Sequence, residues 1–108
     1  MRITTSRIDG AVTVRVHTTR LDAAVADELR RGLAEAFGGD PSQAAVPMVI
    51  DLSDVTFMDS SGLGALVGSL KSAGTKDVSI SNVQPAVRTV LRMTRVDRAI
   101  KVLPPAAS

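Results

Sequence analysis

A short apolar run in the middle of the chain constrains the fold more than any other segment. Residues 46–53 read Val-Pro-Met-Val-Ile-Asp-Leu-Ser, and most of them are apolar. Runs of this length are typical of strands covered on both faces, as in the parallel sheets of α/β domains. The run therefore predicts a central strand buried on both faces, in a domain that combines a sheet with helices.

The segment before this run changes from a strand period to a helical period. Apolar and polar residues alternate over 3–17 around Asp9-Gly10, a pattern typical of two strands joined by a tight turn. His17 falls on the polar side of the second strand and is interpreted as a solvated residue. From Asp22, placed as an N-cap, apolar residues recur with helical spacing until Gly38-Gly39 ends the helix.

Two further helices and two further strands complete the prediction. The helices are expected at residues 60–73 and from Pro85 onward, and the strands at residues 78–82 and 100–103. The predicted order is β-β-α-β-α-β-α-β, which is a single α/β domain with a mixed sheet. This domain is expected to span residues 1–103, followed by a short C-terminal tail at residues 104–108.

Composition excludes several classes of function. The chain has 108 residues, of which 44% are apolar and 22% charged, values typical of one soluble globular domain. The absence of cysteine excludes disulfides, thiolate metal sites and cysteine nucleophiles, and a single histidine leaves little material for acid–base catalysis. A net charge of +2 and the presence of only two aromatic residues argue against nucleic-acid binding. No apolar run approaches the about 20 residues of a membrane helix, so no membrane association is expected and the location is predicted to be cytoplasmic. No cofactor is expected either.

The stretch most informative about function follows the apolar run. Asp59-Ser60-Ser61-Gly62 opens the helix at residues 60–73, where a helix presents unpaired backbone N–H groups and a partial positive charge. A hydroxyl at this place can cap the helix, act as a nucleophile, or accept a phosphoryl group whose charge the helix dipole tolerates. Position alone does not separate Ser60 from Ser61. Two serines beside an aspartate exceed what a single cap requires.

Templates of enzyme sites do not fit this stretch. A nucleophile elbow requires a glycine two positions before the serine, and neither serine has one. The glycines at 62, 64 and 68 miss the spacing of a dinucleotide-binding loop by one residue, and the chain has no Gly-Lys-Ser/Thr sequence for a Walker-type loop. Asp51, Asp54 and Asp59 could suggest magnesium, but they are interpreted as solvated turn residues, so no metal site is predicted. The serine is therefore better interpreted as a substrate than as a catalyst.

The sequence around these serines resembles a known signature. Residues 50–53, Ile-Asp-Leu-Ser, and residues 57–64, Phe-Met-Asp-Ser-Ser-Gly-Leu-Gly, are similar to the STAS domain of bacterial anti-sigma factor antagonists. Leu21-Asp22 before the first helix and residues 82–88 at the start of the third resemble weaker landmarks of the same family. The resemblance implies a STAS-like fold, with a mixed sheet and helices packed mainly on one face.

The resemblance also implies a non-enzymatic phosphoprotein that takes part in partner switching, as in transcription regulation and the stress response. In this family the unphosphorylated antagonist binds an anti-sigma factor that is also a serine kinase, and the sigma factor is released. The kinase then phosphorylates the serine after the motif's aspartate, here Ser60, and a PP2C-type phosphatase reverses this step. The residues expected to bind the partner are Asp22, Met58, Asp59, Ser61, Gly62 and Leu63. The alternative is a STAS scaffold or accessory subunit of a stress-sensing assembly or a lipid transporter.

Several positions near the helix ends depart from the family pattern. Thr19 stands where a glycine commonly precedes the Leu-Asp pair, and Arg95 stands where a glycine often follows the third helix. The terminal helix that is usual in the family is not predicted, because Pro104-Pro105 follows the last strand. Arg88, Arg92 and Arg95 share one side of the third helix, which is interpreted as a solvated face, with an acidic partner as the alternative.

Overall fold

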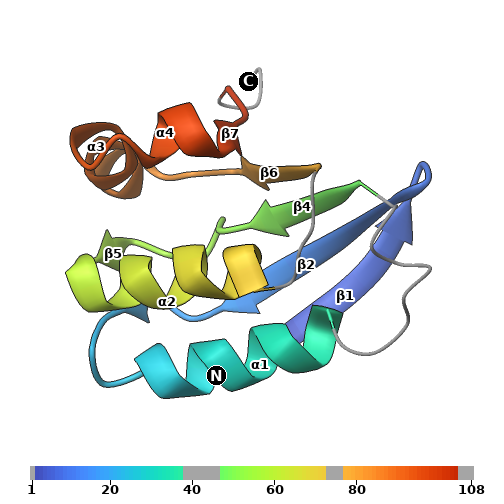
Figure 1. Ribbon diagram of the computed structural model, residues 1–108, viewed down its shortest axis with the longest axis horizontal. Coiled ribbons are helices and arrows are strands. Elements are labelled where there is room, and N and C mark those ends of the chain that lie inside the picture. Colours follow the sequence, from blue (N-terminus) through green and yellow to red (C-terminus); the bar gives the residue numbers. More distant parts are fainter. Residues whose placement is uncertain (1, 38–46, 73–76, 105–108) are drawn as a thin grey trace.

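The computed structural model describes residues 2–37, 47–72 and 77–104, within which it has seven strands and four helices (Figure 1). The strands are β1 (Arg2–Ile8), β2 (Ala11–His17), β3 (Arg20–Leu21), β4 (Met48–Asp51), β5 (Phe57–Met58), β6 (Val78–Ser81) and β7 (Lys101–Val102). The helices are α1 (Ala26–Phe37), α2 (Ser60–Ser72), α3 (Pro85–Met93) and α4 (Val96–Ala99). The predicted helix end at Gly38-Gly39 and residues 105–108 of the predicted tail lie outside the described residues.

The strands form a mixed five-stranded sheet and a separate two-stranded pair. The large sheet has the order β1-β2-β4-β6-β7. Strands β1 and β2 are antiparallel, and the turn between them places Asp9 at φ 52° and Gly10 at φ 80°, as the tight turns of hairpins require. Strands β2, β4, β6 and β7 run parallel, while β3 and β5 pair in parallel outside this sheet. The predicted hairpin and the mixed sheet are both confirmed.

The hydrophobic core lies on one face of the large sheet. Val14, Ile50 and Ile80 are neighbours across β2, β4 and β6, and all three are fully buried. The helices contribute their apolar residues to the same cluster: Leu29 and Leu33 from α1, Leu63, Leu66 and Leu70 from α2, and Val87 and Leu91 from α3. Helices α1 and α2 also pack against each other, and Figure 1 shows them side by side. This shared core confirms that the helices cover mainly one face.

The opposite face of the sheet is less covered than expected. Val49 and Asp51 of β4 point to this face and are half-buried, and no residue of the described strands is fully buried on this side. The prediction of a central strand buried on both faces is therefore wrong. The side chains of β2 and β6 flank Val49, and this lateral shielding is enough for an apolar residue in a central strand without a helix above it.

The structure also contains elements that the periodicity did not predict. Strands β3 and β5 are two residues long, and α4 has four residues, so none of them spans enough residues to show a period. Helix α1 begins at Ala26, not directly after Asp22. The Asp22 side chain instead caps a preceding turn, because its Oδ1 accepts a hydrogen bond from the Ala24 N–H at 3.1 Å.

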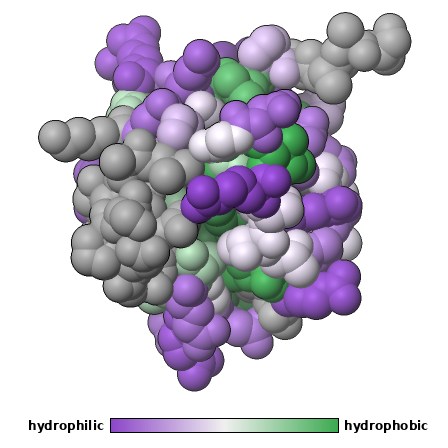
Figure 2. Space-filling view, turned by 90° about the vertical axis from the view of Figure 1, so that its right-hand side faces the viewer, coloured by the Kyte–Doolittle hydropathy of each residue, from purple (hydrophilic) through white to green (hydrophobic). Residues whose placement is uncertain are grey.

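The molecular surface combines hydrophilic side chains with scattered apolar ones. Figure 2 shows one end of the molecule, where apolar patches are separated by hydrophilic side chains. Among the described residues, the large apolar side chains that are exposed are Ile8, Phe57 and Met93. Single exposed apolar residues are common on soluble domains. Phe57 is of interest because it lies next to the serines in the sequence.

Candidate functional site

The start of α2 is held in place by the short β3–β5 pair. Leu21 of β3 lies opposite Met58 of β5, and both side chains are buried. The carbonyl of Leu21 also accepts a hydrogen bond from the N–H of Asp59 at 3.1 Å. On the other side of the pair, the Thr19 carbonyl accepts the N–H groups of Thr56 and Phe57. Two segments distant in the sequence thereby fix the position at which α2 begins.

Asp59, and neither of the serines, caps helix α2. Its Oδ1 accepts a hydrogen bond from the N–H of Gly62 at 3.0 Å, and its carbonyl accepts the N–H of Leu63 at 2.9 Å. This is the geometry of an N-cap residue, followed by Ser60 and Ser61 in the first turn. Both serines are exposed, and within the described residues neither hydroxyl forms a hydrogen bond. The capping interpretation of the serines is therefore wrong, because an aspartate next to them already fills that role.

Gly62 allows α2 to approach β3 closely. A Cβ atom at this position would overlap the carbonyl oxygen and carbonyl carbon of Leu21, which are backbone atoms and cannot turn away. Gly64, two residues further along the helix, has no atom within 4 Å of an added Cβ. The first glycine is thus required by packing, whereas the second lies on the exposed side of the helix.

The predicted partner-binding residues divide into a surface group and a buried group. Ser61 is exposed, and Asp22 and Asp59 are half-buried beside it. The other three are buried and belong to the core or to the helix contact: Met58, Gly62 and Leu63. The buried group supports the site from the core, and a partner can reach only the surface group directly.

Two residues beside the serines were not singled out from the sequence. Arg20 donates a hydrogen bond from Nε to Oδ2 of Asp22 at 3.3 Å, and its Cζ lies 4.2 Å from the centre of the Phe57 ring. Arg20 and Phe57 are opposite each other in the β3–β5 register. The sequence signal that could have identified them is their position, since Arg20 directly precedes Leu21-Asp22 and Phe57 directly precedes Met58-Asp59. The pairing of two such short strands shows no periodicity in the sequence.

The single histidine belongs to a different part of the molecule. His17 Nε2 lies 2.8 Å from the Thr4 hydroxyl, and its Nδ1 lies 3.5 Å from Asp54, which also binds Arg15 at 2.9 Å. These residues lie along β1, β2 and the loop after β4, so His17 is engaged away from the serines. The interpretation of His17 as a solvated residue holds in part, since its side chain is 21% exposed and contacts Thr4 and Asp54.

The other residues considered from the sequence have structural partners of their own. Asp51 accepts a hydrogen bond from the N–H of Ser53, and Arg88 donates one to the carbonyl of Leu103 at 3.0 Å. Arg88 is therefore not part of a free basic face, whereas Arg92 and Arg95 are exposed. Within the described residues, no group of three histidine, cysteine or acidic side chains is placed to hold a metal ion.

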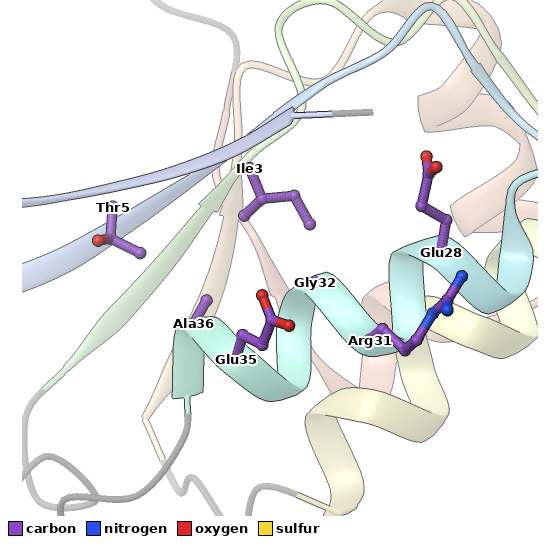
Figure 3. Close-up of a pocket in the computed structure, with 7 residues that line it drawn as sticks. All are labelled: Ile3, Thr5, Glu28, Arg31, Gly32, Glu35 and Ala36. Atoms are coloured by element: carbon purple, nitrogen blue, oxygen red, sulfur yellow. The ribbon is translucent and has the colours of Figure 1, made fainter.

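Two cavities of the described structure are lined by residues outside the first turn of α2. One of about 480 Å³ lies between β1 and α1, where Ile3 points toward the helix and Glu28, Arg31 and Glu35 lie along it (Figure 3). Gly32 faces Ile3, and a Cβ added there would overlap the Ile3 side chain. A second cavity of about 350 Å³ is lined by apolar residues of α2, β6 and the α4 region together with Lys71, Thr94 and Arg95. Neither of these two cavities is lined by Ser60 or Ser61, and both serines are exposed.

None of the helices in the described part of the chain is long and apolar enough to cross a membrane. The longest of them, α2, has thirteen residues and three glycines. A membrane-spanning helix needs about 20 mostly apolar residues.

Comparison with known proteins agrees with this architecture. Residues 2–106 match the family model of the STAS domain. The structure resembles that of an anti-sigma factor antagonist from Mycobacterium paratuberculosis, with a TM-score of 0.79, 25% sequence identity, and coverage of 97% of this chain and 86% of the other. A protein of Thermotoga maritima described as a putative anti-sigma factor antagonist matches with a TM-score of 0.75, 21% identity, and coverage of 96% and 87%. The murine anion transporter Slc26a9 contains a similar domain, with a TM-score of 0.75 and 20% identity, over 93% of this chain but 17% of the transporter.

Proposed function

Because the chain belongs to the STAS domain family, we propose that it is an anti-sigma factor antagonist whose binding is switched off by phosphorylation of Ser60. In its unphosphorylated form it binds an anti-sigma factor that is also a serine kinase, and the sigma factor is released. The kinase transfers the γ-phosphoryl group of ATP to the Ser60 hydroxyl, ADP leaves, and the hydroxyl proton passes to a base of the kinase. A PP2C-type phosphatase restores the hydroxyl by hydrolysis.

The observation that carries this proposal is that Asp59, and neither serine, caps helix α2. A hydroxyl that capped α2 would lose its hydrogen bond on modification, and the helix would lose stability with it. Here the cap is a carboxylate, and the Ser60 side chain is exposed without a hydrogen bond in the described structure. A phosphoryl group can therefore be added without removing any contact that holds the fold.

Electrostatics explains how one phosphate would end binding. Phosphoserine carries about −1.5 to −2 charges near neutral pH, and here they would lie close to Asp22 and Asp59. A partner surface that fits a neutral hydroxyl would have to bury this charge without a counter-ion, at a cost of several kcal/mol. A loss of about 3 kcal/mol already weakens binding a hundredfold.

The surface offered to such a partner is formed by residues of α2, β5 and the turn after β3. It consists of the exposed Ser60, Ser61 and Gly64 on α2, bordered by Phe57 on β5 and Asp22 after β3. Aromatic residues, phenylalanine among them, are enriched in protein–protein interfaces, so the exposed ring of Phe57 suits a binding surface. Met58 and Leu63 support this surface from the core.

Phosphorylation by the cognate kinase tests the proposal directly. Incubation with the kinase and ATP is expected to add one phosphate, detected by intact-protein mass spectrometry. Ser60→Ala should abolish the addition, whereas Ser61→Ala, an equally exposed serine of the same turn, should leave it in place. Phosphate retained in Ser60→Ala and lost in Ser61→Ala would overturn the assignment of the residue.

A second candidate function rests on the likeness to Slc26a9, in which a domain of this fold is part of a transporter. In that case the chain would serve as a scaffold or accessory subunit of a larger assembly. The two functions differ in how they depend on Ser60. Constitutive co-purification with an assembly, unchanged by Ser60→Ala and by Ser60→Asp, would support the scaffold and contradict the switch.

A further inference from the structure

We propose that Arg20 is the internal counter-ion of phosphorylated Ser60, so that modification moves the Arg20 guanidinium from Asp22 to the phosphate. This inference rests on the proposed function and adds a regulatory residue to it. It concerns a side chain of the β3–β5 pair that makes two weak contacts in the unphosphorylated protein and is free to exchange them.

The parallel arrangement of β3 and β5 directs Arg20 toward the serine. Both strands run toward the start of α2, since Leu21 lies opposite Met58 and the Leu21 carbonyl binds the Asp59 N–H. The guanidinium of Arg20 is bound to Asp22, which follows β3 as Asp59 follows β5. The charged end of Arg20 is therefore displaced along the strand direction as far as Asp22, and this direction leads to the start of α2.

The present partners of Arg20 hold it loosely. The Arg20 side chain is 60% exposed, and the structure records one hydrogen bond to Asp22, at the long distance of 3.3 Å. A phosphate offers three acceptor oxygens and about twice the charge of a carboxylate, and guanidinium groups bind phosphate with two parallel hydrogen bonds. The phosphate is thus the stronger of the two competing anions.

Local charge makes a counter-ion necessary. Asp22, Asp59 and Arg20 together carry a formal charge of −1, which phosphorylation would change to about −3. Within β3, β5 and α2, the basic residues are Arg20 and Lys71, and Lys71 lies in the last turn of α2, at the far end from Ser60. Three other arginines are engaged elsewhere, namely Arg15 with Asp54, Arg30 with Asp27, and Arg88 with Leu103, whereas Arg92 is exposed on α3, which contacts β5.

Movement of Arg20 would alter the partner surface beyond the phosphate itself. Asp22 would lose its cation and face the solvent as an unpaired carboxylate, and the ring of Phe57 would lose the guanidinium that now lies over it. One modification would then change the charge or the covering of three neighbouring side chains. A partner that recognises the unphosphorylated arrangement would meet a different surface over a larger area.

The second ionisation of the phosphate reports on Arg20 without any need for a kinase. Phosphoserine is installed at position 60 during translation, and its pKa is measured by phosphorus NMR titration in four proteins. These are the wild type and the variants Arg20→Gln, Arg20→Lys and Arg30→Gln, the last of which removes a similarly exposed arginine from an ion pair on α1. A nearby cation favours the dianion, so its removal raises the pKa. We expect a rise of about 0.5 for Arg20→Gln, near zero for Arg30→Gln, and values close to wild type for Arg20→Lys.

The outcomes separate this inference from the proposed function. Equal pKa values for the Arg20→Gln and Arg30→Gln proteins would overturn the role of Arg20, whatever a kinase does to Ser60. Failure of the kinase to modify Ser60, with an installed phosphate that still responds to Arg20, would contradict the proposed function alone. A shift of the Arg20 Nε–H resonance on phosphorylation, with the Arg30 resonance unchanged, is the second expected readout.

Discussion

Single residues at the start of α2 have separate tasks. Asp59 caps the helix, Gly62 lets it approach Leu21, and Ser60 is left with an exposed hydroxyl. The sequence predicted a functional hydroxyl at this helix start, but it could not assign the cap. Asp and Ser are both good capping residues, and the choice between consecutive candidates depends on where the strand before them ends. That end is set by the β3–β5 contact, which is distant in the sequence.

The two glycines of the motif offer a test of this division at the residue scale. Gly62→Ala places a Cβ against the backbone of Leu21, and we expect the free energy of unfolding to fall by about 1–3 kcal/mol. Gly64→Ala meets open space on the same helix and should raise it by about 0.5–1 kcal/mol, because alanine is the better helix former. Urea denaturation measures both. Equal effects of the two substitutions would show that the close approach of α2 to β3 does not limit stability.

The elements that the sequence failed to predict are those fixed by tertiary contacts. The hairpin, strands β4 and β6, and helices α1 to α3 carry enough residues to show their period or their turn chemistry. Strands β3 and β5 have two residues each and exist because they pair with each other. Arg20 and Phe57 entered the site through this pairing, so the sequence located the serines but not the side chains that surround them.

The end of α3 provides the prediction at the scale of elements. Thr94 is the C-cap of α3, and Arg95 follows it in the left-handed conformation with φ 62°, where glycine is usually found. The side chain of arginine makes this conformation costly by about 1–2 kcal/mol. Arg95→Gly should therefore raise the free energy of unfolding by about 0.5–1 kcal/mol, whereas Arg92→Gly, within the regular turns of α3, should lower it by a similar amount. Thermal or urea unfolding measures the free energy of unfolding of both variants. Destabilisation by Arg95→Gly would contradict the expectation that the left-handed conformation is costly for arginine.

The whole molecule separates its stability from its surface chemistry. One core cluster joins the sheet to α1, α2 and α3, and none of the residues proposed to change on phosphorylation is fully buried. The apolar periodicity predicted this core, because the same residues that show the period are the ones that pack. The sequence overestimated the burial of β4, since a central strand is shielded by its neighbours even on a face without helices.

A charged replacement of Ser60 should accordingly act on binding and not on folding. Ser60→Asp lowers the net charge from +2 to +1 and places an acidic residue in the first turn of α2, where the helix dipole favours it. We expect the melting temperature to stay within about 3 °C of wild type, while affinity for the anti-sigma factor falls. Scanning calorimetry and titration calorimetry measure the two quantities. A large fall in melting temperature would mean that Ser60 contributes to the fold after all.

The capping of α2 by Asp59 also has an evolutionary consequence. Because no hydrogen bond of the described structure depends on the Ser60 hydroxyl, descendants of this gene can exchange Ser60 for another small residue and keep the same domain. Under the proposed function, such descendants would bind without being regulated, and a reverse substitution would restore control in a single step. The aspartate next to the serine would then make the proposed regulation a trait that selection can add or remove independently of the architecture.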